Sequence, residues 1–389
     1  MNKIEFYKHN LSDLDKQEVL KVLDSVFLTT GSLVGEFEQK FVAYMGSKFA
    51  VGVMSCTHAL ELALRYYGIG EGDEVITTPM SFVATANVVE MVGAKPVFVD
   101  VEAETGNLNA ELVEQFVTSK TKAIIPVHLY GQMCDMVKLR AIADKYGLKI
   151  IEDCAHCIEA MRENIRPGWL GDIACFSFYA TKNLTCGEGG AITCNDENIY
   201  SWMLQARSHG INKNAMDRYT KKYEHYDMNF LGYKCNMTNI SAAMMIHQIE
   251  KLENFWKRRD EIANAYSAFF VNNPNVKILK TVSNSKNAWH LYTILVSKES
   301  RDIFLEKLQE NGIGVAVNYR PIHLMRYYRD KYRYKEGDFK NAENIGFSTV
   351  SLPLYPKLKN EEVEYICDKV NSFFHFENKL DLFCKSCSK

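Results

Sequence analysis

The sequence lacks several features that would assign it to a specialised class of protein. None of its apolar runs approaches the roughly 18 to 20 residues that a membrane-spanning helix needs. The N-terminal stretch MNKIEFYKHNLSDLDKQEVL contains no apolar core of the kind that signal peptides have. There is also no internal repeat, no low-complexity tract and no proline-rich linker. We therefore expect a cytoplasmic protein that does not bind membranes.

An excess of positive charge is missing as well. The chain has 46 Lys and Arg residues against 48 Asp and Glu residues, which gives a net charge of -2. Because a nucleic-acid backbone is bound mainly by neutralising its phosphates with basic residues, we do not expect nucleic acid as a partner. Backbone N–H groups bind small anions without any net charge, so a phosphate-bearing ligand is compatible with this composition.

The eleven cysteines form no pattern typical of a disulfide framework or a metal site. Their number is odd and they are scattered through predicted strands and helices, which indicates reduced core residues of a cytosolic protein. The tail CKSC (Cys384 to Cys387) has the spacing of a redox motif or of half a zinc site, but no second pair at metal spacing accompanies it. We expect this tail to have no function and the protein to bind no metal.

Alternating strands and helices are the main pattern that the sequence does contain. With 389 residues, 47% of them hydrophobic and 24% charged, the chain has an ordinary globular composition and the length of two domains. Strands are predicted at 49–56, 73–79, 95–101, 122–131 and 148–155, and helices at 57–68, 81–93 and 135–147. This order, with strands apolar on both faces, is typical of an α/β fold with a mostly parallel central sheet flanked by helices.

The second part of the chain has a different order of elements. A long amphipathic helix at 248–270 is predicted to lead into a smaller α+β domain. That domain is predicted to contain strands at 290–296 and 314–319 and helices at 300–312 and 360–374. We expect a large domain at 1–250, with the N-terminal segment included, and a small C-terminal domain at 251–389.

Polar residues follow the ends of the predicted strands, where open α/β sheets bind their ligands. The first strand leads into Ser55, Thr57 and His58 at a helix start, which suits a phosphate, although a Ser or Thr there is more often only a helix cap. Another strand ends in Glu152 and Asp153, whose carboxylates need N–H or cationic partners. Such a carboxylate either caps the following turn or pairs with a protonated heterocycle.

A lysine follows a third strand, in the segment CFSFYATKNLTCGEGGAI (175–192). A single lysine most often lies on the surface. Where a lysine is partly desolvated, however, its pKa falls and its amine becomes a nucleophile that forms Schiff bases. A phosphate site, the acid Asp153 and the amine of Lys182 are together the groups needed to hold pyridoxal phosphate (PLP).

Several longer motifs follow one another in a fixed order over nearly the whole chain. They are LTTGSLVGEFEQKF (28–41), PMSFVATANVVEMVGAKPVFVDV (79–101), HLYGQMCDM (128–136), IEDCAH (151–156), GDIACFSFYATKNLTCGEGGAI (171–192), RSHG (207–210), GYKCNMTNISAA (232–243), NYRPIH (318–323) and SLPLYP (351–356). With these motifs the sequence resembles the DegT-type sugar aminotransferases, within the aspartate-aminotransferase-like (fold type I) PLP enzymes. The resemblance implies that fold and PLP as the cofactor.

The resemblance also implies roles for individual residues at the cofactor. Lys182 stands where the family has its Schiff-base lysine, and Asp153 stands where an acid faces the pyridine nitrogen. The other positions that the resemblance places there are His156 near the ring hydroxyl, Phe82 on the face of the ring, and Thr57, the backbone at His58 and Ser177 at the phosphate.

Two further groups of residues are implied by the same resemblance. In many family members a segment of the neighbouring subunit contacts the phosphate, and in this sequence it carries Lys234, with Asn236 as the alternative. Thr30, Tyr319 and His323 match positions near the substrate. As isolated residues, Thr30 would be interpreted as part of a turn, and Tyr319 and His323 as structural.

The implied activity is the transfer of an amino group, from L-glutamate, to a nucleotide-linked keto-sugar, most often at C4, in the synthesis of polysaccharide precursors. Sugar dehydratases of this family have histidine at the position of Lys182, so this lysine favours transamination. A homodimer with shared active sites is expected. The alternatives are a same-fold transaminase for a smaller phosphorylated ketone and a non-catalytic regulatory relative. One departure is Cys56, which replaces the usual glycine and would be strained at a positive φ.

Overall fold

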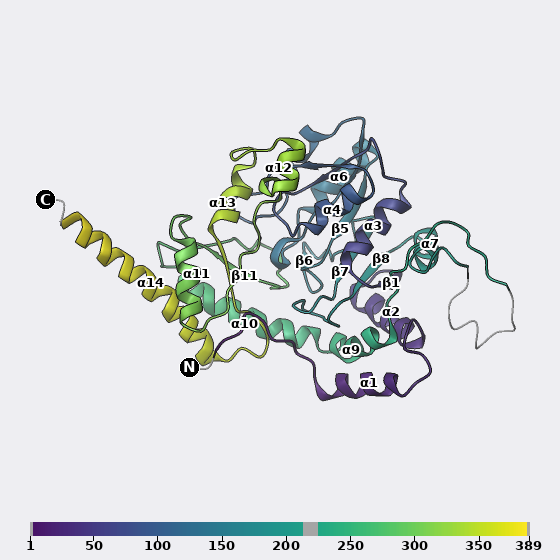
Figure 1. Cartoon of the computed structure of the whole chain (residues 1–389), viewed down its shortest axis with the longest axis horizontal. Helices are drawn as coiled ribbons and strands as arrows, with labels where there is room; N and C mark the ends of the chain where they lie inside the picture. The colour runs from purple at the N-terminus through teal and green to yellow at the C-terminus, as the bar shows by residue number, and fades with distance from the viewer. Residues whose placement is uncertain (1–2, 213–224, 387–389) are drawn as a thin grey trace.

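A seven-stranded sheet forms the centre of the molecule (Figure 1), and the computed structural model describes residues 3–212 and 225–386. The strand order is β1-β8-β7-β5-β4-β2-β3. Strand β8 pairs antiparallel with β1 and β7, whereas the pairs from β7 through β3 are parallel. The strands are β1 (Phe49–Val53), β2 (Glu74–Thr77), β3 (Lys95–Phe98), β4 (Thr121–Ile124), β5 (Lys149–Asp153), β7 (Ile173–Ser177) and β8 (Gly190–Cys194). The predicted α/β fold with a mostly parallel sheet is confirmed.

Helices cover both faces of this sheet, because its strands are apolar on both sides. In β7, for example, Ala174 and Phe176 belong to one core and Ile173 and Cys175 to the other. The helices that pack in the first core include α2 (Ser32–Met45), α6 (Met136–Tyr146) and α9 (Asn239–Ile249). The helices that pack in the second core are α3 (Cys56–Tyr66), α4 (Ala84–Met91) and α7 (Glu197–Ala206). Side chains alternate between the faces along each strand, which produces these two cores.

A three-stranded sheet lies in the later part of the chain, with the order β12-β11-β9 and antiparallel pairing. Its strands are β9 (Lys277–Ile278), β11 (Tyr292–Leu295) and β12 (Thr349–Leu352), and β6 (Met161–Arg162) pairs separately with β10 (Ser285–Lys286). The helices of this part are α10 (Leu252–Phe270), α11 (Arg301–Glu310), η3 (Ile322–Leu324), α12 (Arg326–Tyr332), α13 (Lys340–Ser348) and α14 (Asn360–Ser386). The remaining helices are α1 (Asp13–Leu23), α5 (Ala110–Val113), η1 (Glu114–Phe116) and η2 (Leu129–Gly131).

Three predicted elements differ from the structure. The predicted helix at 248–270 is the end of α9 followed by α10, and no glycine or proline marks the break between them. The last helix, predicted at 360–374, continues to Ser386 and projects away from the body of the molecule (Figure 1). Cys384 of the CKSC tail therefore lies on α14, whereas Cys387 lies outside the described residues.

The third difference is the predicted strand at 314–319, which is not a strand. Its backbone hydrogen bonds are divided between two partners: Gly314 donates to Ile4, and Ala316 exchanges hydrogen bonds with Ser351. Because neither partner runs alongside for more than a residue or two, no continuous ladder forms. The segment still reaches the edge of β12 and carries Tyr319 toward the large sheet.

The N-terminal segment connects the two parts of the chain. Ile4 is buried in the core of the three-stranded sheet and exchanges hydrogen bonds with Gly312 and Gly314. A few residues later, the Tyr7 hydroxyl donates to the backbone carbonyl of Lys182 at 3.0 Å. The division into domains at residue 250 stays a prediction. In the described parts of the chain, no helix combines the length and the apolar character needed to cross a membrane.

Candidate active site

The carboxyl ends of β5 and β7 bring the predicted site residues together. The two strands are adjacent and parallel, and Asp153 at the end of β5 is level with Cys175 in β7. Strand β7 ends at Ser177, and the chain then turns through a loop that returns Lys182 toward the same edge, where Lys182 N–H donates to the Tyr179 carbonyl. Parallel strands therefore deliver the predicted acid and the predicted amine to one place, as expected for an open α/β sheet.

Asp153 is a buried carboxylate whose hydrogen-bond donors are neutral. Only 5% of the residue is exposed. The Thr85 hydroxyl donates to its Oδ2 at 2.8 Å, and the Ala155 N–H donates to its Oδ1 at 3.1 Å. Burial raises the pKa of Asp153, while the Thr85 and Ala155 donors and the charge of Lys182 act to lower it. A buried anion in this setting is best matched by a cationic N–H from a ligand.

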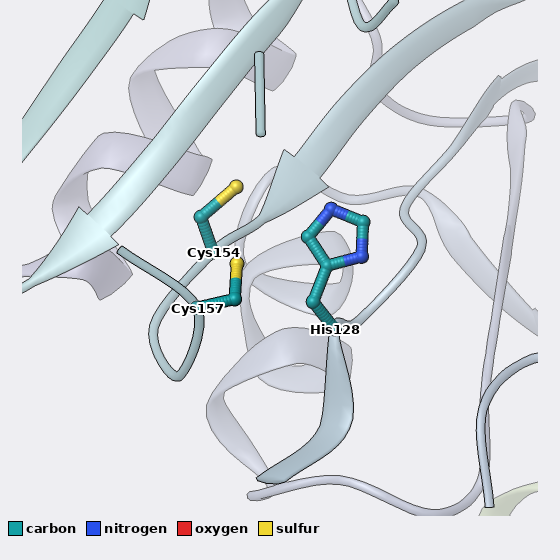
Figure 2. Close-up of side chains that lie close together, drawn as sticks. All are labelled: His128, Cys154 and Cys157. Carbon is teal, nitrogen blue, oxygen red and sulfur yellow. The ribbon is translucent and has the colours of Figure 1, made fainter. Parts of the chain in front are cut away.

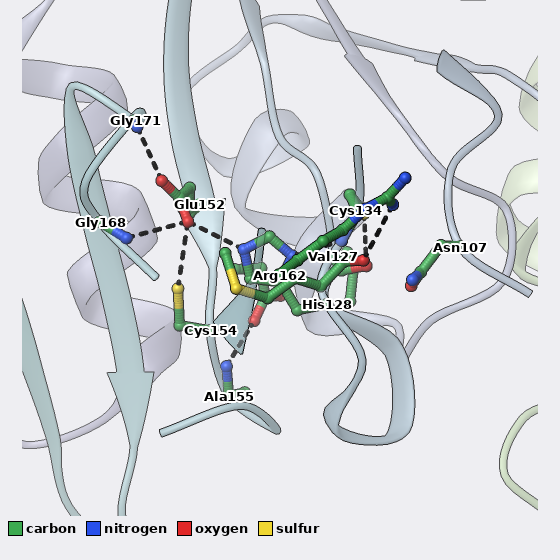
Figure 3. A network of polar contacts seen from close by, with 12 residues as sticks. Asn107, Val127, His128, Cys134, Glu152, Cys154, Ala155, Arg162, Gly168 and Gly171 are labelled. Carbon is green, nitrogen blue, oxygen red and sulfur yellow. Dashed lines mark hydrogen bonds and ion pairs between the residues drawn. The ribbon is translucent and has the colours of Figure 1, made fainter. Parts of the chain in front are cut away.

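Glu152, the neighbouring acid, is used differently (Figure 3). It points to the opposite side of the strand and has no exposed surface. Its Oε1 accepts the Gly171 N–H at 2.7 Å, and its Oε2 accepts the Gly168 N–H at 3.0 Å and contacts His128 Nε2 at 2.8 Å. Glu152 is thus held by partners at Gly168, Gly171 and His128, whereas Asp153 has hydrogen-bond donors at Thr85 and Ala155.

Lys182 carries an amine that is largely withdrawn from water. Burial lowers its pKa from 10.5 to about 8, against the opposing effects of Asp153 and of Cys56. A substantial fraction of the amine is therefore uncharged near neutral pH, which is the form that attacks a carbonyl carbon. Lys182 Nζ lies 3.4 Å from Nε2 of His290, a residue that the sequence analysis did not single out.

Two histidines and a tyrosine stack beside this amine. The ring of His156 lies 4.4 Å from that of His290 and 6.0 Å from that of Tyr319. The backbone N–H of Tyr130 donates to His156 Nδ1 at 3.3 Å, so in the neutral ring Nε2 carries the proton. Burial lowers the pKa of His156 well below its usual value, which keeps the ring neutral. Its Nε2–H faces the Tyr319 hydroxyl at 3.1 Å.

The start of α3 is the predicted phosphate site. Ser55 is its N-cap and accepts the His58 N–H at 3.2 Å, so this amide, predicted to bind phosphate, already has a partner. Thr57 is partly buried in the first turn. Cys56 is the first residue of the helix, is not among the residues with positive φ, and is therefore unstrained. A side chain on Gly190 of β8 would meet the backbone of Ser55 at 2.5 Å, so only glycine lets the helix start this close to the sheet.

The other residues predicted to bind the cofactor differ in exposure and in their contacts. Phe82 is 58% exposed, and its ring lies 6.1 Å from that of Tyr319. The Ser177 hydroxyl accepts the Tyr179 N–H at 3.3 Å. Lys234 Nζ contacts Asn236 Oδ1, and these two residues form a second group with Thr30.

In this second group, Asn236 Nδ2 donates to the Thr30 hydroxyl at 2.6 Å, and that hydroxyl donates to the Met237 carbonyl at 2.7 Å. Among the described residues, no hydrogen bond links this group to Lys182 or Asp153. His323 joins neither group: it has no exposed surface, its Nε2 pairs with Glu343 at 2.9 Å, and its ring packs against Phe339. This geometry favours the structural alternative for His323.

His128, Cys154 and Cys157 lie close together (Figure 2) and are residue types that bind metal ions. The Cys134 N–H donates to His128 Nδ1 at 3.1 Å, so Nε2 holds the ring proton and donates it to Glu152. His128 therefore has no free lone pair for a metal ion. Burial raises the pKa of both thiols, which keeps them protonated. The cluster is best described as part of the core that supports β5.

The site defines a class of enzyme before any relative is considered. An amine of lowered pKa beside a buried carboxylate with neutral donors suits a cofactor that offers an aldehyde to the amine and a protonated nitrogen to the carboxylate, and PLP offers both. The chain belongs to the DegT/DnrJ/EryC1/StrS aminotransferase family, which it matches over residues 10–371. It is therefore a PLP-dependent aminotransferase of the sugar-modifying type, and the predicted family, fold and cofactor are confirmed.

Relatives in sequence and in structure agree with this assignment. The chain is 40% identical over 360 residues to the spore coat polysaccharide biosynthesis protein SpsC of Bacillus subtilis, covering 91% of this chain and 92% of the relative. It is 36% identical over 380 residues to the GDP-perosamine synthase of Escherichia coli O157:H7, covering 96% and 99%. Among solved structures, the PLP form of the sugar aminotransferase Spr1654 from Streptococcus pneumoniae matches with a TM-score of 0.88 and 30% identity, covering 95% and 98%.

Proposed function

We propose that this aminotransferase moves an amino group from L-glutamate to C4 of a nucleotide-linked keto-sugar, in the synthesis of a polysaccharide precursor. The observation that carries the proposal is the juxtaposition of the Lys182 amine and the buried Asp153 carboxylate at the sheet edge. The acceptor class is inferred from the relatives named as a GDP-perosamine synthase and as a spore coat polysaccharide biosynthesis protein.

The residues at the site fit PLP. Each Asp153 oxygen accepts one close N–H or O–H donor, from Thr85 or Ala155, which leaves acceptor capacity for a further N–H. The dipole at the start of α3, with Thr57 beside it, suits the phosphate. When bound, PLP supplies an electrophilic aldehyde carbon and a ring that accepts electrons.

The chain itself contributes binding and proton transfer. Asp153 would hold a proton on the ring nitrogen of bound PLP. Because Asp153 is buried, its ionised form is favourable only when a cationic group such as that protonated nitrogen pairs with it. Lys182, with a pKa of about 8, is able both to accept and to return a proton near neutral pH, as a general acid–base group must. His156 is neutral and presents a donor at Nε2, where Tyr319 now accepts. When a ligand is bound, one of its oxygen atoms could replace the Tyr319 hydroxyl as that acceptor.

A homodimer with shared sites is part of the proposal. Exposed apolar residues lie in the α1–α2 connection and beside the Lys234 segment, with 78% of Val26 and 81% of Leu231 exposed. Apolar surface of this kind is typically covered in a stable complex, and a second copy of the chain would place Lys234 and Asn236 against a neighbouring site. Sedimentation of the full chain should give twice the mass of one chain; a monomer at working concentration would contradict this part of the proposal.

Two rival functions are separated by one set of measurements. The purified chain is incubated with PLP, reduced with borohydride and digested, and we expect the pyridoxyl group on the peptide that contains Lys182. Absence of the group at saturating PLP would favour a non-catalytic regulatory protein. The enzyme is then offered L-glutamate with UDP-, GDP- and dTDP-linked keto-sugars and with small phosphorylated ketones. Mass spectrometry should detect an aminated nucleotide sugar, and turnover of the small ketones alone would favour the alternative substrate.

The Thr85→Val variant tests the environment of Asp153. Valine keeps the shape of threonine but removes the hydroxyl that donates to Asp153 Oδ2, so the pKa of Asp153 should rise further. Loss of one such hydrogen bond corresponds to PLP binding that is about tenfold weaker, which a fluorescence titration measures. Thr77→Val is the matched control, because Thr77 is equally buried and donates only to the Ile125 carbonyl. Equal weakening in both variants would contradict the assignment.

A further inference from the structure

His290 is a titratable side chain within hydrogen-bond distance of the predicted reactive amine. It precedes β11, in the part of the chain after residue 250, and is only 6% exposed. Its Nε2 lies 3.4 Å from Lys182 Nζ, whereas its Nδ1 is buried and has no hydrogen-bond partner. An unpaired polar atom in the core is unusual, and here it belongs to the ring that contacts Lys182.

The unpaired Nδ1 decides where the ring proton resides. Burial and the positive charges of Lys182 and Arg259 lower the pKa of His290 well below its usual value, so the ring carries one proton. A proton on Nδ1 would be a buried donor without an acceptor, which is rarer in proteins than an acceptor without a donor. We infer that the proton is on Nε2, which points at the lysine. An ammonium has no lone pair to accept it, whereas an uncharged amine does.

We propose that His290 is a positioning residue that donates its Nε2–H to the free amine of Lys182 and so favours the uncharged amine. This inference rests on the proposed role of Lys182 as the amine that reacts with the cofactor. Protonation of Lys182 would require His290 to move its own proton to the unpaired Nδ1. His290 thus opposes protonation of Lys182 without carrying any charge itself.

The other groups that face Lys182 act in different directions. Asp153, from β5, and the Cys56 thiol, from α3, both favour the charged amine. His156, from the loop after β5, is neutral and stacks on His290 at 4.4 Å with the rings 29° apart. Desolvation favours the uncharged amine of Lys182. The hydrogen bond donated by His290 favours the same uncharged form. That bond also gives the amine a defined orientation when it is not attached to a ligand.

The surroundings of His290 hold it rigidly in place. Tyr130, which has a positive φ of 58°, donates its N–H to His156 and accepts the His290 N–H at 3.0 Å through its carbonyl. Two residues earlier, the Ala288 carbonyl accepts from Asn183 at 3.0 Å and from Arg259 at 3.3 Å. Asn183 is the residue that follows Lys182, so the segment carrying His290 and the lysine loop are directly hydrogen-bonded.

The test measures the protonation of Lys182 in the chain without PLP. Trace acetic anhydride is added across a pH series, and peptide mass spectrometry gives the pH midpoint for acetylation of Lys182. In the wild type we expect a midpoint near pH about 8. In His290→Gln the side-chain carbonyl is free to turn toward the ammonium, so the midpoint should rise by about half to one pH unit. His290→Phe, which keeps a ring against His156 but removes both nitrogens, should also raise it.

His323→Gln is the matched control, because His323 is another buried histidine with an unpaired Nδ1 but pairs with Glu343. Its Lys182 midpoint should equal that of the wild type. An unchanged or lower midpoint in both His290 variants, with PLP still attached to Lys182 of the wild type, would overturn the inference about His290 but leave the proposed function intact. Failure of the wild type to attach PLP at Lys182 would instead overturn the proposed function.

Discussion

The Lys182→Ala variant is expected to lose covalent attachment of PLP and at least about 10³-fold in turnover. The variant lacks the only side chain that the site offers both as nucleophile and as proton carrier, and general acid–base groups alone contribute on the order of 10²–10⁴-fold. Borohydride reduction should leave the Lys182-containing peptide unlabelled, and amino transfer should be measured by the formation of 2-oxoglutarate from L-glutamate. Methylamine, added as an external base, should restore part of the activity.

The role of Lys182 also predicts how the rate of PLP attachment to the wild type depends on pH. Since the pKa of Lys182 is lowered to about 8, the uncharged fraction of its amine rises as the pH increases through about 8. The rate at which PLP attaches should therefore increase with pH and level off above that value. Lys182→Arg is the control that keeps a positive charge but no attacking amine. Turnover in either variant within tenfold of the wild type would contradict the assigned role.

The Asp153→Asn variant should have opposite effects on activity and on stability. Asparagine keeps one acceptor oxygen, for the Ala155 N–H, and its NH2 group can donate to the Thr85 hydroxyl, but it cannot hold a proton on a ring nitrogen by charge. We expect turnover to fall on the order of 10²-fold or more, as when one electrostatic contact to a reacting group is removed. PLP itself should still become attached to Lys182, because the amine is intact, and the visible absorbance checks this.

Asp153→Asn should increase the stability of the PLP-free chain, although it lowers activity. Burial raises the folded-state pKa of Asp153 above its unfolded value. The stability associated with its protonated form is therefore fully present at acidic pH and is lost as the pH rises through the folded-state pKa. Asp153→Asn avoids this loss, so at neutral pH the PLP-free variant should melt at a higher temperature than the PLP-free wild type. A lower melting temperature for the variant at neutral pH would contradict the account of Asp153 as a buried charge that awaits a cationic partner.

Strand ends were the most informative feature of the sequence. The position of Asp153 and Lys182 after apolar runs predicted that both would lie at one edge of a parallel sheet, and parallel pairing of β5 with β7 places them there. The choice between Glu152 and Asp153 was open in the sequence, because both follow the same strand. The family resemblance pointed to Asp153, and in the structure Glu152 is taken up by hydrogen bonds from Gly168 and Gly171.

His290 and Thr85 were not found in the sequence because their role depends on tertiary contacts. His290 is separated from Lys182 by 108 residues and precedes an apolar run that predicts only a strand. Thr85 lies inside a predicted helix, where a threonine normally faces solvent or a core. The segment 314–319 was misassigned for a similar reason, since its β-like pattern does not show that its hydrogen bonds go to single residues of two separate segments, Ile4 and Ser351.

The attachment of the first residues has a consequence for biosynthesis. Ile4 is hydrogen-bonded to Gly312 and Gly314, and the Tyr7 hydroxyl is hydrogen-bonded to the Lys182 carbonyl. Both contacts join the first residues of the polypeptide to residues that leave the ribosome later. Contacts that span most of a chain form late in folding. A nascent or prematurely terminated polypeptide that stops before residue 312 thus lacks the hydrogen-bond partners of Ile4, and the amine of Lys182 can reach its final surroundings only after His290 has been synthesised.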